Sequence, residues 1–216
     1  MSRFLTSLSF LAPLKNPELR AMYGKSLRGG LLLWGPPGCG KTFLARAVAG
    51  ELQAAFLAVS LADVLDMYIG NSEKNVHALF EQARDAAPCV LFLDEIDAIG
   101  QKRSLTRNNA MRGSVNQLLT ELDGVDSANE GVFVLGATNH PWDVDEALVR
   151  PGRLDRKVFV SPPDLDARLH ILATHFRERP CERLDLKQAA RATAGYSGAD
   201  IAHLCDTAAE LALMDS

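Results

Sequence analysis

The segment Gly35-Pro-Pro-Gly-Cys-Gly-Lys-Thr42 combines residue types and spacing that suit a phosphate-binding loop. Its glycines let backbone N–H groups turn inward around phosphate oxygens, and the helix expected at 43–53 adds a favourable dipole. Lys41 would reach the β- and γ-phosphates, and the Thr42 hydroxyl would ligate Mg²⁺. A glycine-rich turn with a chance lysine is the alternative, but the full pattern directly after an apolar strand favours the phosphate loop.

Two carboxylates, Asp94 and Glu95, end the apolar run Val90-Leu-Phe-Leu93. Because that run is too apolar to hold charges inside a sheet, we expect both side chains to point into a cleft at the carboxyl end of a strand. Asp94 would hold Mg²⁺ through water, and Glu95 would orient and deprotonate a water that attacks a phosphoryl group. Acidic residues are also common helix caps, so the pair gains weight from the phosphate loop. Together the two segments predict a site that hydrolyses Mg-ATP.

Short apolar runs along the chain are typical of buried parallel strands. They lie at 30–34, 56–60, 89–93, 132–136 and 157–160. Between them, apolar residues recur with the helical spacing i, i+3, i+4, i+7, at Val76, Leu79, Phe80 and Ala83 and again at Val115, Leu118, Leu119 and Leu122. This alternation predicts an α/β fold, with a five-stranded parallel sheet and helices on both faces. With the phosphate loop after its first strand, the sheet is expected to be of the P-loop NTPase type.

The pattern changes after Val160, where Ser161-Pro-Pro-Asp164 interrupts the chain and only helical segments follow, at 165–177, 186–194 and 198–213. We therefore predict a nucleotide-binding α/β domain over 1–162 and a small all-helical lid over 163–216. The last helix ends without a capping glycine, and the beginning of the chain is equally abrupt. These ends lead us to expect an excised piece with a truncated lid.

Composition narrows the class of partner. The formal net charge of -4 gives no electrostatic reason to expect binding to nucleic acid or to an anionic membrane, so a protein partner is expected. The apolar runs are far shorter than the roughly 20 residues that span a bilayer, so we expect no membrane span. The four cysteines have neither CxxC nor metal-ligand spacing, which fits a reducing, cytoplasmic setting. Cys39 lies inside the phosphate loop, where redox control is a minor alternative to a tolerated small side chain.

Two further segments, Gly136-Ala-Thr-Asn-His-Pro141 and Ala147-Leu-Val-Arg-Pro-Gly-Arg-Leu-Asp155, complete the pattern. With them the chain closely resembles the AAA family of ring-forming, protein-remodelling ATPases, from about Pro13 onward. The resemblance implies that Asn139 senses the γ-phosphate and helps to place the attacking water. It also implies that Arg150 and Arg153 are arginine fingers that reach into the nucleotide site of a ring neighbour, and that the full-length protein forms a homohexamer. An arginine pair in a loop is otherwise a solvated basic patch.

The resemblance extends to the base and ribose of the nucleotide. Gly195-Tyr-Ser-Gly-Ala-Asp-Ile201 is similar to the start of the family's lid helix, and Ala199 leaves no arginine at its second sensor. The preceding lid helix is similar to one whose residues flank adenine and ribose. The residues expected to bind the nucleotide are Gly35, Pro36, Pro37, Gly38, Cys39, Gly40, Lys41, Thr42, Phe43, Asn139, Ile171, His175, Gly198 and Ala199, and those expected to bind the metal are Thr42 and Asp94.

Family members also carry an aromatic-hydrophobic-glycine loop that faces the central pore of the ring, which matches Asp66-Met-Tyr-Ile-Gly-Asn-Ser-Glu73. The resemblance implies that Tyr68, Ile69 and Gly70 grip an unfolded polypeptide. The alternative is an ordinary half-buried tyrosine, although Gly70 and the following helix favour an exposed loop tip. The basic residues Lys102, Arg103, Arg107 and Arg112 form either a second pore loop or a solvated loop.

Three functions compete on these residues. The first is an ATP-driven motor that remodels, unfolds or translocates protein clients. The second is an ATP-dependent assembly switch, or a chaperone of an enzyme complex, that does not thread its client and therefore needs no Tyr68 in a pore. The third, a DNA-loading subunit, is disfavoured by the acidic balance and the missing sensor arginine. The chain also lacks the upstream Asp-Ile-Gly-Gly stretch that closes over adenine in the family.

Overall fold

The computed structural model describes residues 30–66, 72–99, 109–123, 129, 131–181 and 184–214. The chain divides into two compact units. The first unit holds the chain up to Trp34 together with Thr42–Val158, and the second holds Gly35–Lys41 together with the chain from Phe159 onward. A functional domain boundary at residue 162 stays a prediction.

A five-stranded sheet with the order β2-β3-β4-β1-β5 forms the centre of the first unit. Its strands are β1 (Leu31–Trp34), β2 (Ala55–Ser60), β3 (Cys89–Asp94), β4 (Val132–Thr138) and β5 (Arg156–Phe159). The pairs β1–β4, β2–β3 and β3–β4 run parallel. Strands β3 and β4 are almost wholly buried, which explains their continuous apolar sequences. The predicted strands are confirmed, with ends that differ by one or two residues.

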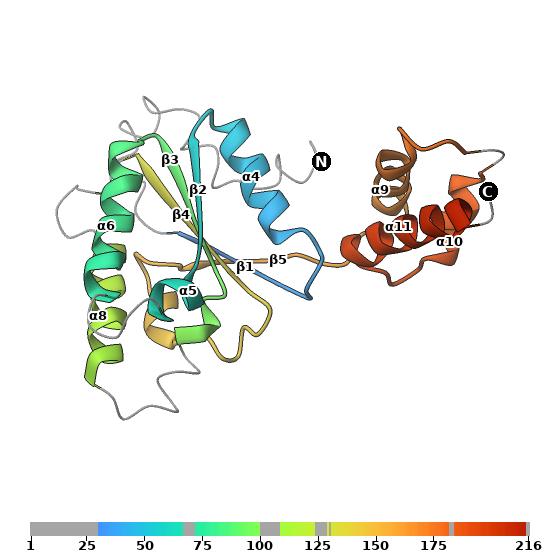
Figure 1. Ribbon diagram of the computed structural model, residues 1–216. Coiled ribbons are helices and arrows are strands. Elements are labelled where there is room, and N and C mark those ends of the chain that lie inside the picture. The colour runs from blue at the N-terminus through green and yellow to red at the C-terminus, as the bar shows by residue number, and fades with distance from the viewer. Residues whose placement is uncertain are drawn as a thin grey trace. The chain divides into compact units, whose positions relative to one another are not determined.

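Helices cover both faces of this sheet. Figure 1 shows α4 (Lys41–Glu51) on one side and α6 (Ser72–Asp85) beside α8 (Asn109–Asp123) on the other. The apolar stripe of α6 is buried at Val76, Phe80 and Ala83, as its spacing predicts. The short helices α5 (Leu61–Asp66) and η2 (Glu146–Val149) lie in the connections between strands. The predicted α/β fold with a P-loop NTPase sheet is confirmed.

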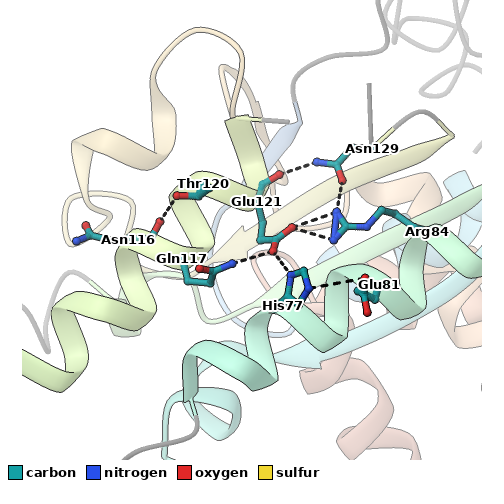
Figure 2. A network of polar contacts seen from close by, with 8 residues as sticks. All are labelled: His77, Glu81, Arg84, Asn116, Gln117, Thr120, Glu121 and Asn129. Atoms are coloured by element: carbon teal, nitrogen blue, oxygen red, sulfur yellow. Dashed lines mark hydrogen bonds and ion pairs between the residues drawn. The ribbon is translucent and has the colours of Figure 1, made fainter. Parts of the chain in front are cut away.

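A buried carboxylate joins α6 to α8 on the same face (Figure 2). The Glu121 side chain is 8% exposed and accepts hydrogen bonds from Arg84 at 3.0 and 3.1 Å and from Gln117 at 2.9 Å. The His77 Nδ1 lies 2.6 Å from Glu121 Oε1, and Asn129 bonds both Arg84 and the Glu121 carbonyl. Because this Glu121 network supplies a cation and several polar partners, the carboxylate is buried without being left unpaired.

The second unit contains the helices α9 (Leu165–Phe176), α10 (Leu186–Ala192) and α11 (Gly198–Met214), and α9 packs against both of the others. Their shared core contains the buried residues Leu172, Ala190, Ile201 and Cys205. The buried Arg168 braces this core, because it donates to the Ala190 carbonyl at 3.0 Å and to the Pro163 carbonyl at 2.9 Å. The predicted all-helical lid is confirmed.

No helix among the described residues combines the length and the apolar character needed to cross a membrane. The same residues hold no group of three or more His, Cys, Asp or Glu side chains that could bind a metal ion. The cysteines Cys39, Cys89, Cys181 and Cys205 are free thiols.

Candidate nucleotide site

The loop between β1 and α4 closes around the side chain of Lys41. This side chain is buried, and its ammonium donates to the Gly35 carbonyl at 2.8 Å and to the Pro36 carbonyl at 2.9 Å. The loop can curl in this way because Gly38 and Gly40 adopt φ values of 72° and 89°, which residues with a Cβ rarely reach. The spacing of glycines and lysine therefore produces a preformed loop with a positive charge inside it.

The same loop contacts the start of α11 through Gly38. The Ala199 N–H donates to the Gly38 carbonyl at 3.2 Å, and a Cβ on Gly38 would lie 2.8 Å from Ser197 Oγ. Ser197 and Asp200 form a reciprocal cap, in which Asp200 accepts from the Ser197 N–H and hydroxyl at 2.8 Å and Ser197 Oγ accepts from the Asp200 N–H at 3.2 Å. These hydrogen bonds hold the pKa of Asp200 below its usual range. The cap fixes the helix start on which Gly198 and Ala199 lie.

The second helix of this part of the site is α9. The Ile171 Cδ1 would lie 3.8 Å from a Cβ placed on Gly198, so Ile171 is brought beside the start of α11. His175 lies one turn further along α9 and is half-buried. The second unit therefore brings together Gly38, Ile171, Gly198 and Ala199, four of the residues expected to bind nucleotide.

The two predicted catalytic carboxylates lie at the end of β3. Glu95 adopts a φ of 55°, uncommon for a residue with a Cβ, and its N–H donates to Asp94 Oδ1 at 2.9 Å. Its Oε2 accepts a hydrogen bond from Ser60 Oγ at 2.9 Å. Ser60 ends β2 and pairs with Asp94 in the register of the two strands. Sequence analysis missed Ser60, and the only signal for it was a polar residue at the end of a predicted strand.

The loop after β4 is fixed by a second pair that sequence analysis missed. The buried Thr138 hydroxyl donates to Asp97 Oδ1 at 2.6 Å and accepts from the His140 N–H at 2.9 Å. Asn139 lies between these two anchored residues and is half-buried. The backbone is therefore fixed on both sides of Asn139, the predicted sensor.

The two predicted arginine fingers have different surroundings. Arg150 is exposed. Arg153 is bound within its own chain: its Nε lies 2.5 Å from Asp123 Oδ1, its Nη2 lies 2.6 Å from Asp123 Oδ2, and its Nη1 donates to the Ala147 carbonyl at 2.6 Å. Asp123, at the end of α8, was not predicted to be part of the site.

The chain's residues fit a nucleotide phosphate and a magnesium ion. Helix α4 begins at Lys41 and has no acidic residue in its first turn, so its N-terminal dipole is left to favour an anion. Thr42, in the same turn, and Asp94 offer oxygen ligands, and Mg²⁺ commonly needs only one or two protein ligands besides substrate phosphates and water.

Phe43, Cys39 and the predicted pore residues add no support for the predicted site. Phe43 is 63% exposed on the first turn of α4. Burial raises the pKa of the Cys39 thiol, against the opposing charge of Lys41, so the thiol stays protonated and gives no support to a redox role. The predicted pore residues Tyr68, Ile69 and Gly70 lie outside the described residues, as do Lys102, Arg103, Arg107 and the side chain of Arg112.

Two family models match this chain. One, described as the ATPase family associated with various cellular activities (AAA), matches residues 31–162. The other, described as an AAA+ lid domain, matches residues 183–216. The first covers every strand of the sheet and the second covers α10 and α11.

Two curated relatives are similar over nearly the whole chain. One is named "Putative cell division cycle ATPase" of Plasmodium falciparum and is 42% identical over 210 residues, or 96% of this chain and 17% of the relative. The other is named "ATP-dependent zinc metalloprotease FtsH 1" of Methylacidiphilum infernorum and is 47% identical over 203 residues, or 92% of this chain and 32% of the relative. The chain therefore spans a third or less of the length of each of these relatives.

Proposed function

This chain belongs to the AAA family of ATPases, which bind and hydrolyse ATP, and we propose that its phosphate loop and its two carboxylates form one Mg-ATP hydrolysis site. The observation that carries the proposal is the ammonium of Lys41 held inside the glycine loop, at 2.8 and 2.9 Å from two loop carbonyls. That placement prepares a positive charge where the β- and γ-phosphates would bind. The parallel pairing of β1 and β3 with the same strand, β4, also supports a shared site, because ligands bind at the carboxyl ends of such strands.

The phosphate loop and the helical lid bind the nucleotide. The backbone of Gly35–Thr42 would surround the phosphates, and Phe43 would also contact the nucleotide. The lid residues Ile171, His175, Gly198 and Ala199 would flank the base and ribose. Thr42 directly, and Asp94 through water, would hold a magnesium ion that offsets the negative charge of the phosphates. The contact of Gly38 with Ala199 supports a lid that participates in binding, since it joins the phosphate loop to α11.

Hydrolysis depends on Glu95. Its carboxylate accepts a proton from a water whose oxygen bonds to the γ-phosphorus, and the bond from that phosphorus to the β,γ-bridging oxygen breaks. Asn139 orients the water, and Ser60 steadies the base through its hydrogen bond to Oε2. A strained backbone at Glu95 is consistent with this role, because such strain clusters at active sites.

The catalytic site is completed by a second subunit. An arginine from the loop Arg150–Asp155 reaches the ATP of a neighbour in a ring, which is a homohexamer in the full-length protein. A guanidinium offsets charge on the transferring phosphoryl group and makes hydrolysis depend on assembly. The exposure of Arg150 supports this assignment.

The ring uses ATP hydrolysis to remodel, unfold or translocate protein clients. The name of the FtsH relative, an ATP-dependent protease, supports a protein client. An ATP-dependent assembly switch that does not thread its client is the second candidate, and the other relative is named a cell division cycle ATPase.

Two substitutions separate binding from hydrolysis. Glu95→Gln keeps the size of the side chain but cannot accept a proton, so Mg-ATP still binds while turnover falls by about a hundred- to ten-thousandfold. Lys41→Ala instead weakens binding itself. Titration with a fluorescent nucleotide, beside a phosphate-release assay, measures both effects. Turnover of Glu95→Gln near the parent rate would exclude Glu95 as the base.

Tyr68→Ala distinguishes threading from switching. In the full-length ring we expect basal ATP hydrolysis to continue while unfolding of a tagged fluorescent reporter is lost, because the loop contacts the client and not the phosphates. The reporter's fluorescence measures unfolding directly. Undiminished unfolding by this variant would favour the switch.

A further inference from the structure

We propose that Arg153 is a tether and not a finger: its pairing with Asp123 holds the loop Arg150–Asp155 so that Arg150 alone is presented to a neighbouring subunit. This makes Asp123 a positioning residue, acting through Arg153 on Arg150. The inference rests on the proposed action of an arginine in trans. It assigns different roles to Arg150 and Arg153, which the sequence alone does not distinguish.

All three nitrogens of the Arg153 guanidinium have hydrogen-bond partners within the chain. Nε and Nη2 pair with the two oxygens of Asp123 at 2.5 and 2.6 Å, and Nη1 donates to the Ala147 carbonyl at 2.6 Å. Every nitrogen of the group is therefore engaged inside its own subunit, in the bidentate geometry that fixes an arginine most firmly. To act on a neighbour's phosphate, Arg153 would first have to break all three contacts.

Burial and charge strengthen the pair. The Arg153 side chain is only 14% exposed, and that of Asp123 is 39% exposed. The hydrogen bonds with Arg153 hold the pKa of Asp123 below its usual range, and the hydrogen bonds with Asp123 raise the pKa of Arg153. Both groups are thus ionised at neutral pH, and freeing Arg153 would separate a partly buried guanidinium from its carboxylate.

The backbone of the loop is anchored at the same place. The Leu154 side chain is buried, and the Leu154 N–H donates to the Leu148 carbonyl at 3.0 Å. The Arg153 carbonyl accepts from the Gly30 N–H, and the Arg153 N–H donates to the Arg150 carbonyl at 3.1 Å. The residue therefore joins Gly30, directly before β1, together with η2 and α8 to the backbone of Arg150. A residue with these contacts holds the loop in position.

Arg150 has the opposite character. It follows η2 directly, in an extended conformation with φ -72° and ψ 157°, and it is exposed. One hydrogen bond links its carbonyl to the tethered residue, so the tether acts on the position from which its side chain extends. Preorganising a guanidinium in this way favours the transition state, because little ordering remains to be done when the neighbour arrives.

The direction in which one substitution changes the turnover rate tests the tether. In the full-length ring, Asp123→Asn removes the charge that fixes Arg153, and we expect turnover to fall by about ten- to a hundredfold with unchanged nucleotide affinity, because Arg150 loses its position. If Asp123 instead restrained a second finger, the same substitution would leave turnover unchanged or raise it. Either of those results overturns the proposal.

A double-mutant cycle gives an independent result. We expect the double variant Asp123→Asn, Arg153→Ala to turn over no more slowly than Arg153→Ala alone, because both changes break the same ion pair between these two residues. Additive losses would overturn the tether. We also expect Arg153→Lys to recover part of the turnover lost in Arg153→Ala, since lysine can still pair with Asp123. A lysine variant as slow as the alanine variant would count against the tether even if Asp123→Asn failed to fold.

Two controls complete the experiment. Arg179 also binds both an aspartate, Asp206, and a backbone carbonyl, that of Cys205, so Asp206→Asn removes a comparable pair and should leave turnover unchanged. Arg150→Ala should lose about a thousandfold in turnover. If Arg150→Ala turns over normally, the action in trans itself has failed. If Arg150→Ala is slow while Asp123→Asn is normal, only the tether has failed.

Discussion

At the scale of residues, the groups that we propose as catalytic have partners that lie far away in the sequence. Lys41, Asp94 and Glu95 belong to contiguous segments, so their types and spacing were enough to predict them. Ser60 and Asp97 contribute through pairings across β2, β3 and β4, at 2.9 Å to Glu95 and 2.6 Å to Thr138. No local pattern specifies such pairings, because they depend on strand order and register. The backbone conformation of Glu95 could not be predicted either.

The Thr138 hydroxyl gives a prediction at this scale. Thr138→Val keeps the shape of the side chain but leaves the Asp97 carboxylate and the His140 N–H without that partner. Unmet hydrogen bonds at buried groups cost about 1–3 kcal/mol, so we expect a loss of this size in the free energy of unfolding together with slower turnover through a displaced Asn139. Urea denaturation and phosphate release measure the two effects. Thr138→Ser keeps the hydroxyl and should preserve both properties, and a valine variant that matched it would show that the hydroxyl does not position Asn139.

At the scale of elements, helices α6 and α8 are held by both apolar and ionic contacts. The stripe Val76, Phe80, Ala83 packs α6 onto the sheet, and the Glu121 network joins α6 to α8. Periodicity predicted the first kind of contact, since it follows from helical spacing alone. It could not predict the second, because Arg84 and Glu121 lie on different helices. The same limit applies to Asp123, which shares α8 with Glu121 and pairs with Arg153.

The Glu121 network predicts a stability effect that is local to the first unit. Glu121→Leu leaves Arg84, which is 21% exposed, without its carboxylate. We expect the free energy of unfolding to fall by about 3 kcal/mol, the lower end of the range for breaking a buried pair, because Arg84 retains some contact with water. Chemical denaturation measures the loss. Glu81→Gln is the matched control: it removes a carboxylate that is 62% exposed and lies 3.7 Å from His77, and it should change stability little. Equal effects of the two changes would show that burial of Glu121 adds nothing.

At the scale of the whole molecule, this chain corresponds to an ATPase module within longer relatives. It spans 17% of one of these relatives and 32% of the other. The α/β sheet and the helical lid could be predicted from alternating patterns and the break at Ser161-Pro-Pro-Asp164. The proposed client could not be predicted, because only the proposed pore loop would contact it. We propose a division of the site between subunits, with Lys41 and Glu95 on one side and Arg150 on the other.

Mixing two inactive variants of the full-length protein tests this division most directly. Lys41→Ala subunits bind ATP weakly but keep Arg150, while Arg150→Ala subunits bind ATP but lack the guanidinium. We expect each variant alone to turn over about a thousandfold more slowly than the parent, and mixed rings of differently tagged, co-expressed subunits to regain hydrolysis, because an intact site then faces an intact arginine. Phosphate release by rings purified through both tags is the measurement. Activity no greater than that of the separate variants would contradict a site completed in trans.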